Sequence, residues 1–459
     1  MSLDKTNNND WNWIKAKDFM IFNPRESVKK GTAVKNVPMD KIEPKTKEIL
    51  NYEITEYKSG VKFRNGDTLM ARITPCLENG KISQVSILDY NEIGAGSTEF
   101  IVLREKEGIS DKDFIYYLSN SEFFKEPAIK SMVGSSGRQR VQRDVIENLD
   151  IYVPPLETQK KIGKLLSYFD DKISLNKKIN KNLEQLSQNL FRKWFIDFDL
   201  KNDFNMSEPF KESNLGEIPE SWEIKTIGDL SDVKGRIGWR GYTTNDLVDE
   251  GPWVVGGKEI TSGFIDFNSA KHLTREKYDE SPEIMLRDKD LIIAKTGTIG
   301  PIAMYYEIYG EATLNPNVGL IRSKNIAPAL LLTFFKTPRA QYYLNEFTTS
   351  SVQPAINQTT IKQLEVALPS DKQLLNKIGA KFEEINLLQF NLNEETKKLQ
   401  RLRDTLLPKL MSGEIDVSKI NCDLIITSHY LSARFPVIQH LFIKSYNLTS
   451  RLSDTAINV

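Results

Sequence analysis

The chain has 459 residues, of which 39% are hydrophobic and 27% are charged, and its 62 basic and 62 acidic side chains give a formal net charge of zero. This length exceeds one ordinary hydrophobic core and predicts roughly two to four domains. No apolar run approaches the roughly 20 residues that cross a bilayer, and the N-terminus lacks the apolar core of a signal peptide. We therefore expect a cytoplasmic globular protein without a membrane partner.

Cysteine and histidine are too scarce for most metal and nucleophile chemistry. The chain contains only Cys76, Cys422, His272, His429 and His440. Two distant cysteines form no disulfide framework, and no zinc-type spacing occurs. We expect no metal site and no catalytic triad. The neutral net charge neither suggests nor excludes nucleic acid, which local basic patches would have to bind.

The first part of the chain reads as strands, turns and short helices. FRNGDTLMARITPCLENGKISQV (63–85) and STEFIVLR (97–104) look like strands joined by Gly and Pro turns. Downstream, GSSGRQRVQR (134–143) contains three arginines and two glutamines but no acidic residue. Arginine can bind guanine and glutamine can bind adenine, while either can hold a phosphate. A solvated basic loop is the structural alternative.

A long helix is predicted next. Five residues of its apolar stripe lie seven apart: Ile162, Phe169, Asn176, Leu183 and Leu190. A strict seven-residue repeat keeps one stripe facing a partner helix, which indicates a coiled coil. The stripe's single polar residue is the asparagine, which either fixes the register of the pair from a buried position or lies at the rim facing water. An ordinary amphipathic core helix is the alternative for the whole segment.

The second half of the chain repeats this order. LRDKDLIIAKTGTIGPIAMYY (286–306) and NPNVGLIR (315–322) occupy the places of the earlier strands, so that Asp67 corresponds to Asp290 and Arg72 to Lys295. A second mixed stretch, VKGRIGWRGY (233–242), combines basic, aromatic and glycine residues, and the glycines let the backbone approach a ligand. A plain surface loop is again the alternative.

A second heptad stripe closes the repeat. It contains, at the same offset, Ile378, Ile385, Leu392, Leu399 and Leu406. The stripes are expected to be widened by flanking residues, namely Leu166, Ile173, Ile179, Leu186, Phe382, Leu388 and Leu402. Ser370 and Gln373 suggest a capping box, Gly413 suits a C-terminal stop, and Pro408 should kink or end the helix early.

Enzyme motifs of DNA modification do not fit the sequence. The nearest segments to the Asn/Asp-Pro-Pro-aromatic loop of adenine methyltransferases are NPRE at Asn23 and NPNV at Asn315. GPWVVGGKE at Gly251 resembles a phosphate-binding loop, but its glycines are misplaced and Glu259 stands where a hydroxyl should bind magnesium. We therefore expect no ATP site and no catalytic residues.

The order of parts resembles the specificity subunit of Type I restriction-modification systems over about residues 10–417. The resemblance rests on five segments in the family's order: ARITPCLENGK (71–81), SSGRQRV (135–141), LFRKWFIDFD (190–199), IPESWEIKTIGDL (218–230) and LLPKLMSGEI (406–415). It implies a non-catalytic subunit, acting in bacterial defence, whose two target recognition domains each read one half of a split, asymmetric sequence in double-stranded DNA. The implied partners are two modification subunits, docked on the helices, and restriction subunits that join through them. S-adenosylmethionine, ATP and magnesium are expected only in those partners.

The implied fold is α+β, with two globular domains separated by two long antiparallel coiled-coil helices in a pseudo-two-fold internal repeat. The expected boundaries are 1–155 and 214–369 for the recognition domains, 156–200 and 370–417 for the helices, 201–213 for a linker and 418–459 for an atypical tail. On such an arrangement the half-sites would lie roughly one helical turn of DNA, about 34–36 Å, apart.

The sequence proposes two sets of contact residues. The DNA candidates are Arg72, Lys81, Arg138, Gln139, Arg140, Arg143, Lys234, Arg236, Arg240, Lys258 and Lys295. Four of them, Arg72, Lys81, Lys258 and Lys295, lie in or beside glycine-containing turns and could equally be plain surface charges. The candidates for a modification-subunit contact are Phe191, Trp194, Phe195 and Phe198, for which packing against the neighbouring domain is the alternative.

Three competing functions remain open at this point. A coiled-coil adaptor that binds only proteins predicts partner binding without a DNA footprint. An enzyme of the same system is opposed by the missing motifs. A silent or shuffled allele is suggested by residues 418–459, which have no counterpart in the first repeat.

Overall fold

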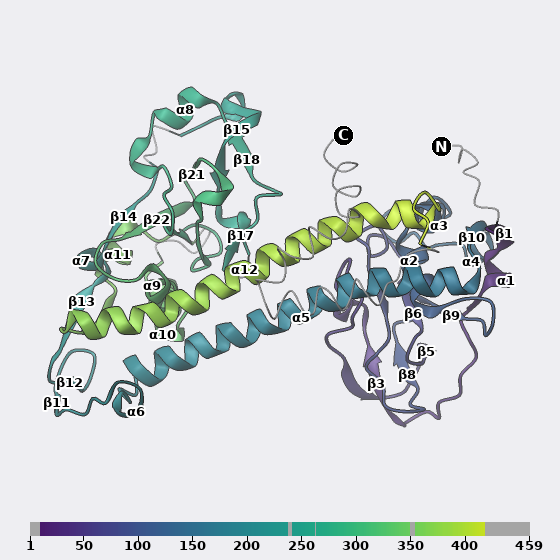
Figure 1. Ribbon diagram of the computed structural model, residues 1–459, viewed down its shortest axis with the longest axis horizontal. Coiled ribbons are helices and arrows are strands. Elements are labelled where there is room, and N and C mark those ends of the chain that lie inside the picture. The colour runs from purple at the N-terminus through teal and green to yellow at the C-terminus, as the bar shows by residue number, and fades with distance from the viewer. Residues whose placement is uncertain (1–9, 237–240, 262, 349–353, 418–459) are drawn as a thin grey trace, which may run out of the picture. The chain divides into compact units, whose positions relative to one another are not determined.

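The computed structural model describes residues 10–236, 241–261, 263–348 and 354–417. The chain forms two compact units. The first combines residues up to Asn176 with those from Glu395 onward, and the second contains Lys177–Glu394. Two helices of 40 residues each, α5 (Leu156–Phe195) and α12 (Lys372–Met411), therefore contribute to both units (Figure 1). No helix in these described ranges is long and apolar enough to span a bilayer.

The first unit is built on two four-stranded sheets. One has the order β2 (Met20–Phe22), β9 (Phe100–Glu105), β6 (Thr68–Ala71) and β7 (Ile82–Gln84). The other has the order β4 (Glu53–Glu56), β3 (Ala33–Val37), β8 (Gly94–Gly96) and β5 (Val61–Phe63). A separate antiparallel pair joins β1 (Asn12–Lys15) to β10 (Asp150–Val153). The helices are α1 (Ala16–Phe19), α2 (Lys112–Asn120), α3 (Glu122–Lys130) and α4 (Arg143–Glu147), with a 3-10 turn at Met39–Lys41.

The second unit repeats this plan. Its main sheet has the order β14 (Ser231–Lys234), β22 (Val318–Ser323), β19 (Leu291–Ala294) and β20 (Ile302–Met304). A second sheet has the order β18 (Lys271–Leu273), β15 (Leu247–Val255) and β21 (Ala312–Leu314). The strand pairs are β13 (Trp222–Thr226) with β23 (Glu365–Pro369), β16 (Ile260–Thr261) with β17 (Phe264–Ile265), and β11 (Phe210–Lys211) with β12 (Ile218–Pro219).

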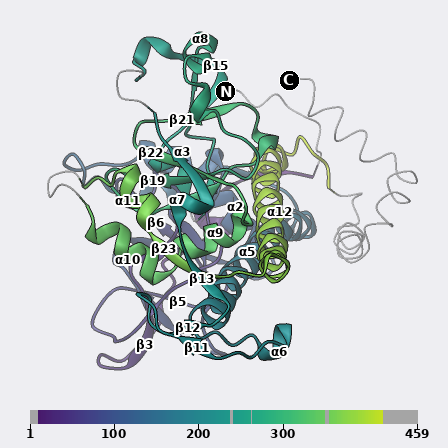
Figure 2. The ribbon, with the colours of Figure 1, turned by 90° about the vertical axis from the view of Figure 1, so that its left-hand side faces the viewer.

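The second unit also contains short helices. They are α6 (Lys201–Phe204), α7 (Ile227–Leu230), α8 (Arg275–Asp279), α9 (Pro328–Phe335), α10 (Pro338–Glu346) and α11 (Gln358–Gln363). Of these, α7, α8, α9 and α11 contact its strands. The 3-10 turns are Thr244–Asp246, Gly257–Glu259, Pro282–Ile284 and Glu307–Tyr309. Helix α9, whose apolar sequence PALLLTFF is almost fully buried, packs on β20 and β22 (Figure 2). A helix that is apolar on most sides is stable only in such a core position.

The internal repeat predicted from the sequence is confirmed by the topology. The strand orders β2-β9-β6-β7 and β14-β22-β19-β20 match position by position. In each unit the first strand of the repeat pairs antiparallel with the last strand before a long helix, β1 with β10 and β13 with β23. The mixed helix and strand content agrees with the expected α+β class. Both repeats therefore use one framework.

One buried ion pair occurs at the same place in both frameworks. Arg104 donates from Nε and Nη2 to the two carboxylate oxygens of Asp67 at 2.6 and 2.7 Å. Arg322 binds Asp290 in the same bidentate way, at 2.9 and 2.6 Å. Each aspartate also accepts a backbone N–H three residues earlier in its turn, at 2.7 Å. Because both carboxylates are buried, this pairing satisfies them where unpaired charge would be costly.

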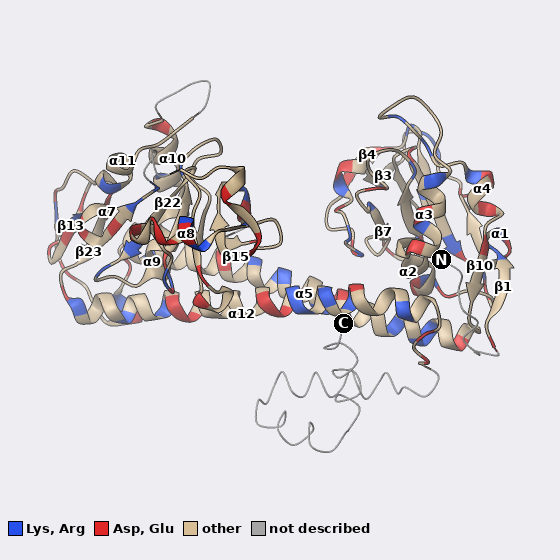
Figure 3. Cartoon of the chain, turned by 90° about the horizontal axis from the view of Figure 1, so that it is seen from above, with Lys and Arg blue, Asp and Glu red and all other residues tan. Residues whose placement is uncertain are grey.

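The long helices pair antiparallel within each unit. In the first unit Asp170 binds Arg403 and Asn176 donates to Glu395 at 2.7 Å. In the second unit Gln389 donates to the backbone oxygen of Asn180 at 3.4 Å. Partners further along α5 therefore lie earlier along α12. Figure 3 shows that charged residues of both signs are interspersed along both helices.

The heptad residues differ in how deeply they are buried. Ile162, Asn176, Ile378 and Leu399 are buried, and the other six predicted stripe residues, Phe169, Leu183, Leu190, Ile385, Leu392 and Leu406, are half-buried. The predicted widening is wrong at three flanking positions, Leu186, Leu388 and Leu402, which are 45%, 46% and 42% exposed. A two-helix pair buries only a narrow seam, so residues beside it face outward unless a domain covers them.

The ends of α12 correct two further details. Asp371 caps the helix, accepting from the backbone N–H of Gln373 at 2.7 Å, so the predicted capping box at Ser370 is wrong. The helix also continues past Pro408 to Met411, since a proline so close to the last turn disrupts little of the hydrogen-bond ladder. The predicted stop at Gly413 is confirmed by its positive φ of 77°.

Candidate nucleic-acid interface

Three separate segments of the first unit meet at the end of β6. Arg72 directly follows β6, Glu99 directly precedes β9, and Arg140 lies in the loop before α4. The backbone N–H of Arg72 donates to the oxygen of Glu99 at 2.9 Å, and Val141 donates to the oxygen of Arg72 at 2.8 Å. Sheet pairing therefore fixes all three positions, although they are far apart in sequence.

The side chains of Arg72, Glu99 and Arg140, which we call the Arg72 cluster, form a charged centre. Arg140 binds the carboxylate of Glu99 bidentately, with Nε at 3.0 Å from both oxygens and Nη2 at 2.7 Å from Oε1. The hydrogen bond from Arg140 holds the pKa of Glu99 below its usual value, and the positive charge of Arg72 acts in the same direction. The Nε of Arg72 is buried without a hydrogen-bond partner in the described structure. A buried donor without an acceptor is costly, so this nitrogen does not contribute to holding the cluster together.

The other basic candidates of this region differ in accessibility. Arg138 is exposed in the loop beside Gly137, whose φ is 75°. The backbone oxygen of Gln139 accepts from the N–H of Thr74 at 3.0 Å, which places this glutamine beside the cluster. Arg143 is exposed but pairs with Glu147 at 2.5 Å. Lys81 differs from the rest, because its Nζ donates to the backbone oxygen of Met39 at 2.8 Å. Its ammonium group is thus already hydrogen-bonded within the fold.

The second unit places Lys295 at the position of Arg72. Lys295 directly follows β19, its N–H donates to the oxygen of Asn317 at 3.0 Å, and Ile356 donates to its oxygen at 2.9 Å. No carboxylate among the described residues pairs with its ammonium group. Burial lowers the pKa of Lys295 below its usual value. A side-chain carbon at Gly235 would lie 3.2 Å from its Nζ, so the glycine leaves the space that this lysine occupies.

The remaining candidates of the second unit are scattered. Arg236 is only 5% exposed and donates to the backbone oxygen of Leu314 at 2.8 Å, which makes it a core residue of this domain. Lys234 is half-buried at the end of β14. Lys258 is exposed and lies 3.6 Å from a carboxylate oxygen of Glu259. Arg240 lies outside the described residues.

The four aromatic candidates for a partner contact pack inside the second unit. Phe191, Trp194 and Phe195 are buried in its main hydrophobic cluster. The ring of Phe195 lies 5.5 Å from that of Trp222, and the half-buried Phe198 lies 5.2 Å from the same tryptophan. This is the arrangement that the packing alternative expects.

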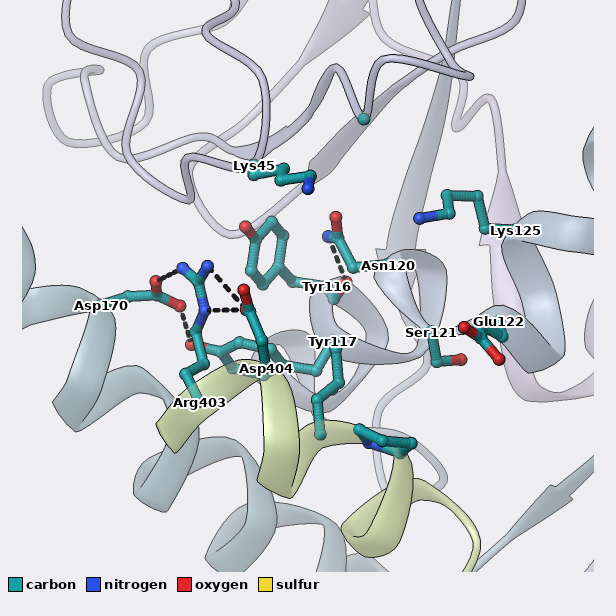
Figure 4. A pocket seen from close by; sticks show the side chains of 13 residues that line it. Lys45, Tyr116, Tyr117, Asn120, Ser121, Glu122, Lys125, Asp170, Arg403 and Asp404 are labelled. Atoms are coloured by element: carbon teal, nitrogen blue, oxygen red, sulfur yellow. Dashed lines mark hydrogen bonds and ion pairs between the residues drawn. The ribbon is translucent and has the colours of Figure 1, made fainter. Parts of the chain in front are cut away.

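A pocket of about 270 Å³ lies in the first unit, where the end of α12 packs on α2 and α3 (Figure 4). Arg403 lies between the carboxylates of Asp170 and Asp404, and Tyr117 donates to Asp170 at 2.6 Å. Lys45 and Lys125 also line the pocket. None of the predicted DNA contacts lines this pocket. Its buried charges are balanced within the fold, which fits a structural role.

Reasoning from the sequence alone did not find Glu99. The basic stretch 134–143 contains no acidic residue, and Glu99 lies about forty residues earlier in the chain, so the composition of that stretch does not point to it. The signal in the sequence is the repeat itself, since STEFIVLR and NPNVGLIR occupy corresponding places and put Glu99 opposite Asn317. A carboxylate beside Arg72 in one copy and an amide in the other mark a position that varies between repeats.

Comparison with known proteins identifies the family. The model of the family described as Type I restriction modification DNA specificity domain matches residues 8–185 and 219–400. The MjaVIII specificity subunit of Methanocaldococcus jannaschii is 24% identical over 338 residues, covering 72% of this chain and 76% of the relative. The HindI specificity subunit of Haemophilus influenzae is 24% identical over 428 residues, covering 80% and 90%.

A solved structure supports the same fold. The S subunit of a Type I restriction-modification system from M. genitalium is 16% identical and aligns with a TM-score of 0.56, covering 89% of this chain and 98% of that one. The family model covers most of the chain in two copies, and these copies coincide with the two repeated frameworks. This chain belongs to the family of Type I restriction-modification DNA specificity proteins.

Proposed function

We propose that this chain is the DNA sequence-recognition subunit of a Type I restriction-modification complex. Each recognition domain, residues 1–155 and 214–369, reads one half of a bipartite site in double-stranded DNA. The observation that carries this proposal is the repeat of one framework with different side chains at its equivalent positions. The residue that follows the equivalent strands β6 and β19 differs, being Arg72 in one domain and Lys295 in the other. The buried arginine–aspartate pairs at Asp67 and Asp290 are the same in both domains. A shared scaffold with changed contacts suits two different half-sites, so the target is asymmetric.

The chemistry at the strand ends suits DNA. Guanidinium and ammonium groups bind phosphates, and arginine also reads guanine in the major groove. Arg138 and the Arg72 cluster supply these groups in the first domain, and Lys295 supplies one in the second. Each phosphate that is neutralised contributes about −0.9 to the slope of log affinity against log salt.

The long helices have a separate role in this proposal. Segments 156–200 and 370–417 set the spacing between the half-sites and dock the modification subunits. The exposed leucines beside the heptad seam, Leu186, Leu388 and Leu402, are the apolar residues that such a subunit could cover. The chain itself is non-catalytic in this scheme. Methyl transfer and cleavage belong to the modification and restriction subunits, which hold S-adenosylmethionine, ATP and magnesium.

Single-molecule methylation sequencing tests the proposal directly. DNA is taken from cells that express this chain with a modification subunit, and the control cells express the modification subunit alone. We expect a new split motif with two specified halves around an unspecified spacer. If the subunits are soluble and co-purify but no split motif is methylated, the recognition role is refuted. Subunits that do not associate would instead refute the docking role.

A further inference from the structure

The three positions of the Arg72 cluster have exact topological equivalents in the second domain. Arg72 and Lys295 each follow the equivalent strands β6 and β19, and Glu99 and Asn317 each precede β9 and β22. The third position is set by an isolated bridge, which joins Ile73 to Arg140 in one domain and Thr296 to Ala355 in the other. The first domain thus carries Arg, Glu and Arg where the second carries Lys, Asn and Ala.

Hydrogen bonds show that the correspondence is physical. The residue after β6 donates its N–H to Glu99 and accepts from Val141, while the residue after β19 donates to Asn317 and accepts from Ile356. The backbone hydrogen bonds at these positions are therefore the same in both domains, whereas the side chains differ. Such positions are suited to change what a domain recognises without changing its fold.

The first centre combines a donor and an acceptor that suit one base pair. The half-buried Arg72 makes no side-chain hydrogen bond or ion pair with another described residue, so its guanidinium has unused hydrogen-bonding capacity. Glu99 is held by Arg140 but a carboxylate offers about four acceptor sites, which leaves room for a further donor. Arginine binds guanine O6 and N7, and glutamate accepts from cytosine N4.

We propose that Arg72 and Glu99 are the specificity-determining residues of the first domain and read a G·C pair, with Arg140 as the positioning residue of Glu99. The equivalent Lys295 and Asn317 offer no carboxylate acceptor, so the second half-site differs at the corresponding base pair. This inference rests on the proposed function, because it assigns residues to the recognition that the function requires.

The experiment measures methylation rates of duplexes by the full chain assembled with its modification subunits. Each base pair of the wild-type motif is substituted in turn, and rates are compared for Arg72→Gln and Glu99→Gln. We expect both variants to lose discrimination at the same G·C position of the first half, by roughly 5- to 150-fold, because a bidentate contact contributes about that much selectivity. Discrimination in the second half should not change. Lys295→Gln is the matched control and should alter the second half only.

Several results would overturn the inference. An equal loss of rate on every duplex would mean that the cluster holds a phosphate, and unchanged discrimination would mean that it contacts no base. A wild-type first half without a G·C pair would also exclude it. If Glu99→Gln does not assemble, Arg140→Gln removes the same ion pair from a side chain that is 41% exposed. A wild-type complex that yields no split motif would instead refute the proposed function.

Discussion

Asp290 and Asp67 show how a single residue can hold a recognition domain together. Asp290 is 3% exposed and binds Arg322 bidentately, so Asp290→Ala leaves a partly buried guanidinium without its carboxylate. Removing one partner of a buried pair costs about 3–5 kcal/mol. We expect faster amide hydrogen exchange in β19 and β22, with β6 and β9 of the other domain as the internal reference.

An exposed ion pair provides the matched control for this change. Arg275 and Asp279 form an i,i+4 pair whose side chains are 55% and 51% exposed. Such pairs contribute about 0.3–0.5 kcal/mol, so Asp279→Ala should leave exchange in β19 unchanged. Equal effects of the two substitutions would show that the buried pair is not what stabilises the sheet.

The titration of Lys295 makes a second prediction at the residue scale. Burial lowers its pKa, so the ammonium loses its proton at a lower pH than other lysines do. A group that is neutral cannot attract DNA, and the second domain should therefore lose affinity as pH rises toward the ordinary lysine range. Lys295→Arg should abolish this part of the loss, since arginine stays charged.

Fluorescence anisotropy of the assembled complex on its target duplex, from pH 7 to pH 10, measures this effect. Lys258→Arg is the control, because Lys258 is an exposed lysine of the same domain. Identical pH profiles for the wild type and Lys295→Arg would mean that Lys295 does not contribute its charge to binding.

Individual residues show where prediction from the sequence succeeded and where it did not. The equivalence of Asp67 with Asp290, and of Arg72 with Lys295, could be predicted because short strand patterns repeat. The burial of Arg236 could not, since its partners Leu314 and Thr313 lie more than seventy residues away. Charge alone marks a residue as a DNA candidate, and only the fold shows whether its charge is already satisfied.

At the scale of elements, three polar side chains, Arg403, Asp170 and Tyr117, join α12 to α5 and to α2 of the first domain. Arg403 is 10% exposed and Asp170 is 7% exposed. Arg403→Ala would leave Asp170 with the hydroxyl of Tyr117 as its remaining donor in this group. We expect a loss near the lower end of about 3–5 kcal/mol, because that hydrogen bond persists.

Urea unfolding and hydrogen exchange over residues 395–411 of the full chain measure this loss. Arg401→Ala is the control, because Arg401 is an exposed arginine of the same helix two residues away. If both variants exchange alike, the ion pair does not anchor the helix end.

The long helices were the elements that the sequence described best. A seven-residue period is a local property, so the stripes predict two long helices that each face a partner, whereas the antiparallel pairing of the two was implied by the family resemblance. The heptad pattern does not decide between a buried and a rim position for Asn176. In the structure Asn176 is buried and donates a hydrogen bond to Glu395. The exposure of Leu388 also depends on what covers the helix, and periodicity cannot report that.

At the scale of the whole molecule, the repeat is more informative than any motif. Five short segments suggested the family, but each recognition framework is assembled from strands whose order cannot be read along the chain. The pairing of β1 with β10, and of β13 with β23, closes each domain just before a long helix. Strands that are distant in sequence thereby bring Arg72, Glu99 and Arg140 together, a proximity that only the fold reveals.

The balance of charge leads to a last prediction for the whole chain. With 62 basic and 62 acidic residues, the chain has no net charge with which to attract DNA over long distances. Its own DNA affinity should come from a few local phosphate contacts. About four such contacts would give a slope of log affinity against log salt near −3.6.

Salt titrations of the chain alone and of the assembled complex, on the same duplex, measure these slopes by anisotropy. We expect a slope of about −4 or shallower for the chain alone and a steeper one for the complex, since the partner subunits add phosphate contacts. Arg138→Ala should make both slopes shallower by about 0.9, because Arg138 is an exposed arginine of the basic loop. The change should be equal on target and non-target DNA. A slope near −8 for the chain alone would require about nine contacts, more than a local patch explains, and would show that the two domains engage the DNA backbone extensively without their partners.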